Sequence, residues 1–234
     1  MKNHSFILPA VFMVIVFLLN GCGSTDVAES KDVSQSKIYQ DYFICFNDDL
    51  EDYYCQVMFR FGGSGGTTLH ISEPGSIQVN QTVMSGEKLI LRGFAYTTNI
   101  SKTTTNFEFL YTDINNQKLS NKATINPLID INIPDSISKT HDNIITFGGN
   151  ALGRNEKLVA KINGNGNTYA SVETNIEKAT SITLTPDILA TLQPGTANIQ
   201  FIRTIDKNLD ETTELGGRIK SQYFSKKYVV KIVL

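Results

Sequence analysis

The sequence predicts an all-β protein, and three observations carry that prediction. Short runs in which apolar and polar residues alternate recur along most of the 234 residues, and this two-residue period is typical of half-buried strands. Residues that favour turns separate the runs, as in the Asn-rich and Gly-rich segments 113–116 and 164–167. Only one short segment, 185–192, has helical signals. Runs this short and evenly spaced predict antiparallel β-sandwiches rather than alternating strands and helices.

The first residues of the chain have the pattern of an export leader. Lys2 provides a positive charge, and an apolar run over 6–19, interrupted only by Pro9, follows it. This run is too short to cross a bilayer core of ~30 Å comfortably as a helix. A charged head before an apolar centre is typical of a secretory signal. We therefore predict a signal peptide over 1–21.

The leader ends in Leu19, Asn20, Gly21 and Cys22, which resembles the lipobox of bacterial lipoproteins. Asn20 is a less usual residue at its position, while the other three match. The resemblance implies cleavage between Gly21 and Cys22, diacylation of the Cys22 thiol and, usually, acylation of the new amino terminus. Two or more acyl chains give stable membrane attachment. An ordinary secretory signal and a single-span anchor are the alternatives.

Two further expectations concern the chain that follows Cys22. Gly23 and Ser24 come next without an aspartate, a pattern that resembles lipoproteins exported to the outer membrane of diderm bacteria. The expected location is therefore the bacterial cell envelope, with a lipid anchor in the outer membrane. Residues 22–37 are small, polar and of mixed charge. Because they bury little apolar surface, we predict a flexible tether there.

Cys45 and Cys55 lie in two aromatic, strand-like runs that the polar segment 47–52 joins. Export places both thiols in an oxidising compartment, where pairing is the usual outcome. We predict a disulfide across this hairpin, which contributes ~2–3 kcal/mol by the loop-entropy relation. The alternative is a thiol pair for redox or metal chemistry. The spacing does not match C-x-x-C, however, and no histidine is near in sequence.

The strand pattern begins near Ile38 and divides into two modules at Asn126 and Pro127. We predict an N-terminal β module with the disulfide hairpin over 38–125, and a C-terminal module over 126–234. The strands expected in the first module are 39–46, 53–61, 67–71, 88–94, 107–112 and 119–125. Those expected in the second are 129–133, 143–147, 157–163, 168–173, 181–184, 197–205, 218–224 and 228–233.

The helical segment has a recognisable beginning and end. Thr185 is an expected N-cap, Pro186 occupies the first helical position and Asp187 lies in the first turn, while Pro194 and Gly195 end the segment. A brief helix between two strands, followed by Leu-x-Pro-Gly, resembles the E–F crossover of bacterial immunoglobulin-like domains. The resemblance implies one or two immunoglobulin-like β-sandwich modules. The Cys…Trp…Cys pattern of antibody domains is absent from the sequence, so the likeness concerns architecture alone.

Motifs for nucleophilic catalysis are weak. Residues 62–66 fit G-x-S-x-G, but a hydrolase elbow requires a helix after the serine. The residues that follow, 67–71, favour a strand, so we interpret the glycines as a flexible joint. His70 and His141 are the histidines that remain after cleavage, and nothing in the sequence marks either as a catalytic base.

Acidic segments offer the remaining candidates. Asp48, Asp49, Glu51 and Asp52 are possible calcium ligands, but their spacing does not match an EF-hand loop, and a solvated hairpin tip is the preferred interpretation. A second acidic stretch spans 206–214 between two late strands. The segment 135–137 resembles the O-glycosylation signal of Bacteroidetes. We assign no catalytic residue, metal or cofactor.

A net charge of −2 gives no electrostatic case for nucleic acid. The hypothesis is a membrane-anchored envelope lipoprotein that acts as a non-enzymatic binding or structural module and contacts a glycan, an adhesion target or another envelope protein. The alternative is a glycan- or peptide-processing enzyme, or an accessory subunit of one.

Overall fold

The computed structural model describes residues 26–100 and 105–234. The fold is of the all-β sandwich type, with 58% strand and 6% helix, which confirms the predicted class. The predicted signal peptide over 1–21, the cleavage point between Gly21 and Cys22, and the lipidation of Cys22 lie outside the described residues. Within the described ranges, no helix is long and apolar enough to cross a membrane.

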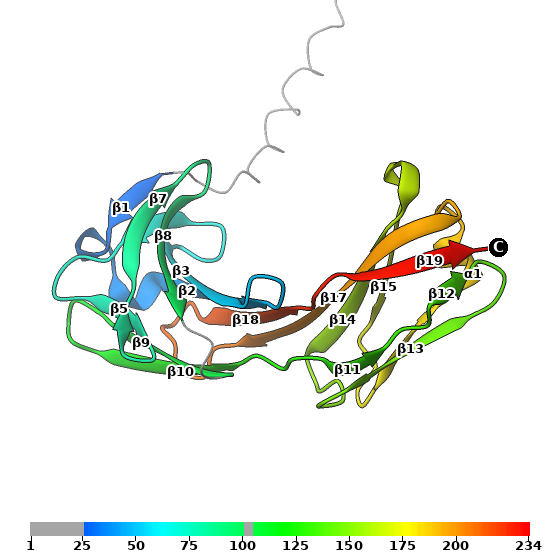
Figure 1. Cartoon of the computed structure of the whole chain (residues 1–234). Coiled ribbons are helices and arrows are strands. Elements are labelled where there is room, and N and C mark those ends of the chain that lie inside the picture. Colours follow the sequence, from blue (N-terminus) through cyan, green and yellow to red (C-terminus); the bar gives the residue numbers. More distant parts are fainter. Residues whose placement is uncertain (1–25, 101–104) are drawn as a thin grey trace, which may run out of the picture.

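The strands form two lobes, which we call the N-terminal and C-terminal lobes (Figure 1). The N-terminal lobe contains β1 (Val27–Glu29), β2 (Ile38–Asn47), β3 (Asp52–Phe61), β4 (Thr67–His70), β5 (Ser76–Val79), β6 (Thr82–Val83), β7 (Ser85–Leu89), β8 (Gly93–Ile100), β9 (Asn106–Thr112) and β10 (Lys118–Thr124). The C-terminal lobe contains β11 (Ile129–Asn132), β12 (Ser136–Ser138), β13 (Asn143–Gly148), β14 (Glu156–Asn163), β15 (Tyr169–Thr174), β16 (Ser181–Leu184), β17 (Gly195–Asn208) and β19 (Tyr228–Val233).

One large sheet, which we call the shared sheet, joins the lobes. Its path is β1-β4-β3-β2-β18-β17-β14-β15, in which β18 is Gly217–Phe224. β17 pairs with β19 near its beginning and with β18 over its last seven residues. β18 then runs parallel to β2, with Gly217 opposite Gln40 and Phe224 opposite Asn47. The predicted division into 38–125 and 126–234 therefore does not hold for this sheet, because a late strand completes the N-terminal lobe.

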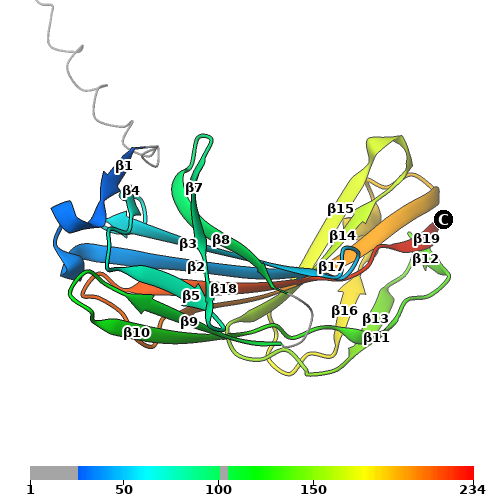
Figure 2. The same ribbon diagram turned by 60° about the vertical axis from the view of Figure 1, so that its left-hand side comes forward.

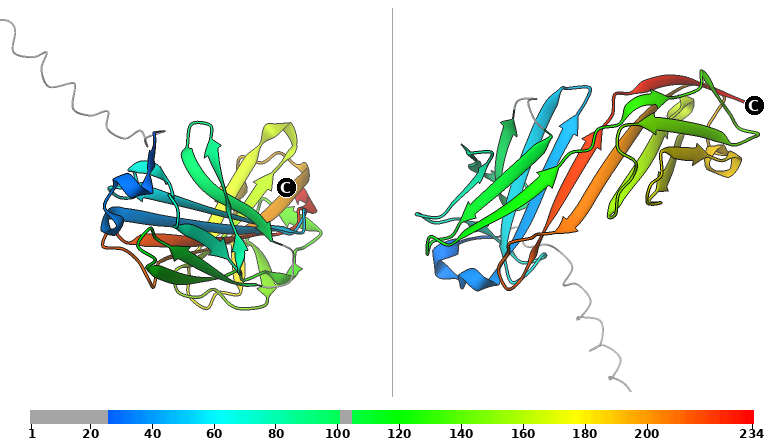
Figure 3. Two further views of the ribbon diagram at one scale, coloured as in Figure 1. Left: turned by 90° about the vertical axis from the view of Figure 1, so that its left-hand side faces the viewer. Right: turned by 90° about the horizontal axis from the view of Figure 1, so that it is seen from below.

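Two smaller sheets cover one face of the shared sheet, which we call its inner face (Figures 1, 2 and 3). In the N-terminal lobe the second sheet is β10-β9-β5-β6. Aromatic rings fill the space between the layers: the Tyr42 and Phe109 centroids are 5.2 Å apart, and those of Phe59 and Tyr111 are 4.5 Å apart. Burial of such rings is the main stabilising contribution of this core.

In the C-terminal lobe the second sheet is β11-β13-β16. Its buried side chains join one apolar core with those of β14 and β17. The short helix α1 (Pro186–Leu189) lies between β16 and β17, where the sequence predicts a helix. Thr185 occupies the N-cap position, although its side chain makes no capping hydrogen bond.

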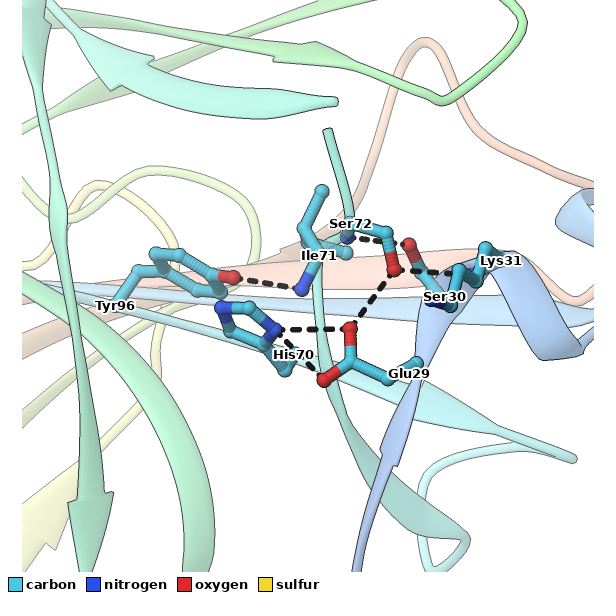
Figure 4. A network of polar contacts seen from close by, with 7 residues as sticks. All are labelled: Glu29, Ser30, Lys31, His70, Ile71, Ser72 and Tyr96. Carbon is cyan, nitrogen blue, oxygen red and sulfur yellow. Dashed lines mark hydrogen bonds and ion pairs between the residues drawn. The ribbon is translucent and has the colours of Figure 1, made fainter. Parts of the chain in front are cut away.

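The described part of the predicted tether is ordered, which corrects that prediction. β1 pairs in parallel with β4, and Ser30 is fully buried. The Glu29 carboxylate lies 3.0 Å from His70 Nδ1 and accepts a 2.9 Å hydrogen bond from the Ser72 hydroxyl, while the Ser72 backbone N–H donates to Ser30 Oγ (Figure 4). Polar contacts hold the segment, together with Ala28 and Val33 that pack against the core. An argument from composition alone does not detect these contacts.

The predicted disulfide between Cys45 and Cys55 is absent, and both thiols are free. The strand register explains this result. Cys45 lies opposite Tyr54, and Cys55 lies opposite Ile44. Because side chains alternate between the faces of a sheet, the two thiols point to opposite sides. Burial raises the pKa of the Cys55 thiol to about 12 and also raises that of Cys45.

The strand predicted over 88–94 is also wrong, because a turn interrupts it. Leu91 and Gly93 both have positive φ, at 60° and 84°. β7 ends at Leu89 and β8 begins at Gly93, and the two strands form a hairpin. The sequence also gives no prediction of the short strands β1, β5, β6 and β12.

Candidate functional site: the outer face of the shared sheet

The outer face of the shared sheet, opposite the two smaller sheets, is open in the part of the chain that the structure describes. The β7–β8 hairpin rises at one end of this face and the β14–β15 hairpin at the other (Figures 1 and 2). We call the region between them the trough. It contains two hollows of about 500 and 470 Å³, which share Lys220 and Gln222. Together they follow the sheet across the junction of the lobes.

The strand register places the trough side chains in rows across neighbouring strands. One row consists of Gln56 on β3, Phe43 on β2, Lys220 on β18 and Asp206 on β17, each opposite the next. These side chains share one face because direct cross-strand partners do so. The row therefore combines an amide, an aromatic ring and two charges from two strand pairs, β2–β3 and β17–β18, that are distant from each other in sequence.

Two aromatic rings, Phe43 and Tyr54, line the first hollow. Phe43 is opposite Gln56, and Tyr54 is two residues before Gln56 on β3, so the two rings are diagonal neighbours. Gln56 Nε2 donates to the Tyr54 hydroxyl at 3.3 Å. Burial raises the pKa of Tyr54, and the nearby Glu87 carboxylate adds to the effect. The hydroxyl therefore stays protonated and can donate a hydrogen bond.

Two of the cations in this hollow have acidic partners. Arg218 Nε lies 2.9 Å from Asp41 Oδ1, and this hydrogen bond raises the pKa of Arg218. Lys220 Nζ lies 3.8 Å from Asp206 Oδ2. Each pair is partly exposed, so solvent weakens its contribution to stability.

Arg60 and Arg92 line the same hollow, and no described acidic side chain forms an ion pair with either. The Arg60 guanidinium makes two long contacts, 3.4 Å to the Gly66 carbonyl oxygen and 3.4 Å to the Met58 sulfur. Its Nε is buried without a hydrogen-bond partner in the structure. Both arginines are therefore available to an anionic group.

The turn of the β7–β8 hairpin fixes the position of Arg92. Gly93 packs so closely on Thr68 that an added Cβ would meet Thr68 Oγ1 at 2.2 Å. The Phe94 backbone N–H donates to the same oxygen at 2.9 Å. Thr68 is the cross-strand partner of Arg60. The hairpin is thus held against β4 beside Arg60, and the two arginines border the same hollow.

The structure places the G-x-S-x-G segment, residues 62–66, between β3 and β4. Gly62 and Gly63 have positive φ, and a strand follows at Thr67, as the sequence predicts. A helix after the serine, which a hydrolase elbow requires, is not formed here. Ser64 lines the trough, where it is one of several polar groups.

The acidic segments form structural contacts. In the 47–52 hairpin, Asp48 accepts from the Tyr223 hydroxyl and Asp49 from the Lys227 backbone N–H, both at 3.3 Å. In the late loop, Asp210 pairs with Lys207. Glu211 accepts from the Ser120 backbone N–H, and Glu214 pairs with Lys37. Within 26–100 and 105–234, no group of three His, Cys, Asp or Glu side chains could hold a metal ion.

Two carboxylates and an arginine do meet in the trough, since Asp41 and Asp206 flank β18, which carries Arg218. Each carboxylate has its own basic partner, Arg218 for Asp41 and Lys220 for Asp206. Both carboxylates are therefore already engaged in ion pairs within the trough.

Sequence reasoning missed most of the trough. In the two aromatic runs around the hairpin, Tyr42, Phe46 and Tyr53 are buried in the core. Phe43 and Tyr54 point to the opposite face. The available signal was that aromatic residues occur at consecutive positions, which places rings on both faces of a strand.

Comparisons with known proteins identify no family. No family model matches the chain, and no curated protein gives a significant match. Among solved structures, the chain is similar to Tp47, the 47-kilodalton lipoprotein of Treponema pallidum, at 10% identity and a TM-score of 0.36, over 86% of this chain and 52% of that chain. It therefore spans about half the length of that protein.

Two further structures have lower scores. SGBP-B of the Bacteroides ovatus mixed-linkage glucan utilization locus, solved in complex with a mixed-linkage heptasaccharide, has 13% identity and a TM-score of 0.25, over 99% of this chain and 71% of that chain. The Yersinia pseudotuberculosis adhesin InvE has 8% identity and a TM-score of 0.24, over 86% of this chain and 60% of that chain. Similarity at this level carries no argument about function.

Proposed function

We propose that this protein is a lipid-anchored protein of the bacterial envelope that binds a glycan chain in the trough without chemically altering it. The observation that carries the proposal is the open outer face of the shared sheet, where two connected hollows lie between raised hairpins. The anchor at Cys22 and the outer-membrane location belong to the same proposal and rest on the lipobox resemblance.

The lining supports a glycan as ligand. Sugar rings pack well on aromatic faces, which Phe43 and Tyr54 supply, and sugar hydroxyls pair with amides such as Gln56 and Gln222. The first hollow, about 500 Å³, lies within the usual ~300–1,000 Å³ of small-molecule sites. Because a second hollow continues from it, the trough accommodates a chain of several sugars.

The contacts of the trough carboxylates support binding rather than hydrolysis. Glycoside hydrolysis needs one carboxylic acid that keeps its proton and a second carboxylate that attacks or activates water. Asp41 and Asp206 each have a basic partner. An enzyme or an accessory subunit of one is the alternative, and it predicts chain cleavage that depends on one of these two acids.

The test is a glycan array probed with the full-length protein purified in detergent, followed by titration of each hit. Tyr54→Ala removes a ring from the trough and is expected to weaken binding by about tenfold or more, the size typical of an aromatic contact residue. The matched control is Tyr169→Ala. Tyr169 is half exposed on β15 and lines neither hollow.

Equal affinity of the Tyr54→Ala variant and the parent would contradict the trough as the site. Shortening of a bound oligosaccharide over time, lost in Asp41→Asn or Asp206→Asn, would instead establish the enzyme alternative.

The anchor is tested separately, by metabolic labelling with a fatty acid. We expect label on the parent and none on Cys22→Ala, which should leave the membrane fraction. Protease treatment of intact cells, with an antibody to the C-terminal lobe, then reports whether the protein faces outward or the periplasm. Membrane retention of an unlabelled Cys22→Ala protein would favour a single-span anchor.

A further inference from the structure

We infer that the glycan bound in the trough is acidic, and that Arg60 and Arg92 recognise its anionic groups. This inference rests on the proposed function and adds the chemical class of the ligand to it. The ligand class is a polysaccharide that carries carboxylate or sulfate groups along its chain.

Positive charge gathers in the first hollow of the trough. The hollow between β3, β2 and β18 is lined by four cations, Arg60, Arg92, Arg218 and Lys220, and one acid, Asp41. At the adjoining hollow, the buried Glu156 carboxylate is paired with Arg203 on the inner face and does not offset this charge. The whole chain has a net charge of −2. The excess of positive charge in the first hollow therefore does not reflect the composition of the protein.

Two of these four cations already have acidic partners. Arg218 is paired with Asp41, and Lys220 faces Asp206. Arg60 and Arg92 have no such partner among the described acids, and Arg60 contacts only a carbonyl oxygen and a thioether sulfur. A guanidinium group binds carboxylate or sulfate oxygens through two parallel N–H donors. An anionic ligand would satisfy groups that the protein itself leaves free.

Contacts with neighbouring strands hold the backbone at both arginines. Arg60 is part of β3, an interior strand of the shared sheet. Arg92 precedes Gly93, which packs directly on the cross-strand partner of Arg60. The rings of Phe43 and Tyr54 line the same hollow. A sugar ring stacked on either aromatic side chain would therefore present its acidic substituent to a nearby guanidinium.

The experiment compares three polymers on the full-length protein in detergent: sodium polygalacturonate, dextran sulfate and uncharged dextran. We expect the two acidic polymers to bind and the uncharged one to bind at least about tenfold more weakly, as expected when charged contacts are lost. Binding should weaken as salt rises, because solvent-exposed charges are screened. A preference between polygalacturonate and dextran sulfate identifies carboxylate or sulfate as the group recognised.

The variants are Arg60→Gln and Arg92→Gln, singly and together, with Arg154→Gln as the matched control. Arg154 is exposed and lines neither hollow. We expect the double variant to bind the acidic polymers more weakly, and its remaining binding to depend less on salt. Arg154→Gln should keep the affinity and the salt dependence of the parent. Thermal unfolding verifies that each variant is folded.

The two proposals fail in different ways. If uncharged dextran binds in the trough as tightly as the acidic polymers, and the double variant binds all three like the parent, the inference about charge is overturned and the proposed function stands. If acidic polymers bind but Tyr54→Ala and the double arginine variant are both unaffected, the trough is not the site and both proposals fail.

Discussion

Two arginine–carboxylate pairs lie on opposite faces of the shared sheet. On the inner face, Arg203 pairs with Glu156, and their side chains are 1% and 6% exposed. On the outer face, Arg218 pairs with Asp41, at 45% and 21% exposed. The chemistry is the same, but the surroundings differ. Burial, rather than residue type, therefore decides whether such a pair maintains the fold or is available to a ligand.

The inner pair is fully hydrogen bonded. Arg203 donates to the carbonyl oxygens of Asn150 and Ala151 at 2.7 and 3.0 Å, in addition to Glu156. Glu156 also accepts from the Asn126 side chain at 2.6 Å. The pair thus connects β14 and β17 to a loop and to the segment between the lobes. Its role is structural.

The largest expected effect comes from breaking the inner pair. Arg203→Met leaves Glu156 buried without its cation, and we expect it to lower the free energy of unfolding by about 3–5 kcal/mol. Urea unfolding followed by circular dichroism measures the change.

The double variant Arg203→Met with Glu156→Gln is the control for charge. It should recover most of the stability lost by Arg203→Met, because the remaining amide carries no charge. If Arg203→Met lowers the free energy of unfolding by less than about 1 kcal/mol, the inner pair contributes no more than a solvent-exposed pair. The two faces of the sheet would then not differ in this respect.

The next effect concerns the strand that joins the lobes. Ile219 lies on the inner face of β18 and is 2% exposed. Ile219→Ala should cost about 2–5 kcal/mol, through lost burial and the cavity left behind. Because β18 and β17 belong to one sheet, both lobes should unfold in a single transition, which hydrogen exchange of each lobe measures in urea.

Ile144→Ala, at a position 62% exposed on β13, is the control for the loss of a methyl-rich side chain at the surface. It should change the free energy of unfolding by less than about 0.5 kcal/mol. Two separate transitions, with only the N-terminal lobe shifted by Ile219→Ala, would show that the lobes are independent despite their shared strand pairing.

A smaller effect is expected on the outer face. Asp41→Asn should change the free energy of unfolding by less than about 1 kcal/mol, because the pair with Arg218 is solvated. It also frees the Arg218 guanidinium for a ligand. We therefore expect polygalacturonate to bind about two- to fivefold more tightly. This corresponds to less than about 1 kcal/mol of binding free energy. Weaker binding in calorimetry would indicate that Asp41 itself contacts the ligand.

The local parts of this fold could be predicted from the sequence. The expected strands 181–184 and 228–233 coincide with β16 and β19, and the short helix lies at its expected place. Alternating polarity and turn residues are signals within a few neighbouring residues, and these suffice for such elements. The wrong strand over 88–94 shows the limit, because nothing nearby revealed the left-handed conformation of Leu91.

The non-local parts could not be predicted. Periodicity tells which residues of β2 and β18 share a face, but it does not identify β18 as the parallel neighbour of β2. The failed disulfide has the same origin, since a register shifted by one residue would have placed Cys45 and Cys55 opposite each other. Arg218 joins Arg60 and Arg92 in one hollow only through the pairing of β18 with β2, so the sequence did not reveal the candidate site.

The smallest expected effect is at the edge of the shared sheet, where Glu29 meets His70 and Ser72 (Figure 4). Hydrogen bonds from these two residues lower the pKa of Glu29 below its usual 4.5. A carboxylate whose pKa is lower in the folded state stabilises that state above its unfolded pKa, and the contribution disappears as the pH falls through the folded value. As the pH falls below about 4.5 and through the lower folded pKa, we therefore expect β1 to detach from β4 increasingly often, while the rest of the sheet persists.

Hydrogen exchange of residues 27–29, corrected for the intrinsic pH dependence of exchange, measures this detachment between about pH 6 and pH 3. Glu29→Gln should give fast exchange in this segment throughout the range. Glu173→Gln removes a distant exposed ion pair with Lys157 and should leave the exchange of residues 27–29 unchanged. Detachment matters for the shape of the protein, because β1 is the first described strand after the proposed anchor at Cys22. If Cys22 carries the proposed anchor, detachment of β1 would lengthen the connection between that anchor and the trough. Protection of 27–29 that stays constant to pH 3 would show that strand pairing alone holds β1.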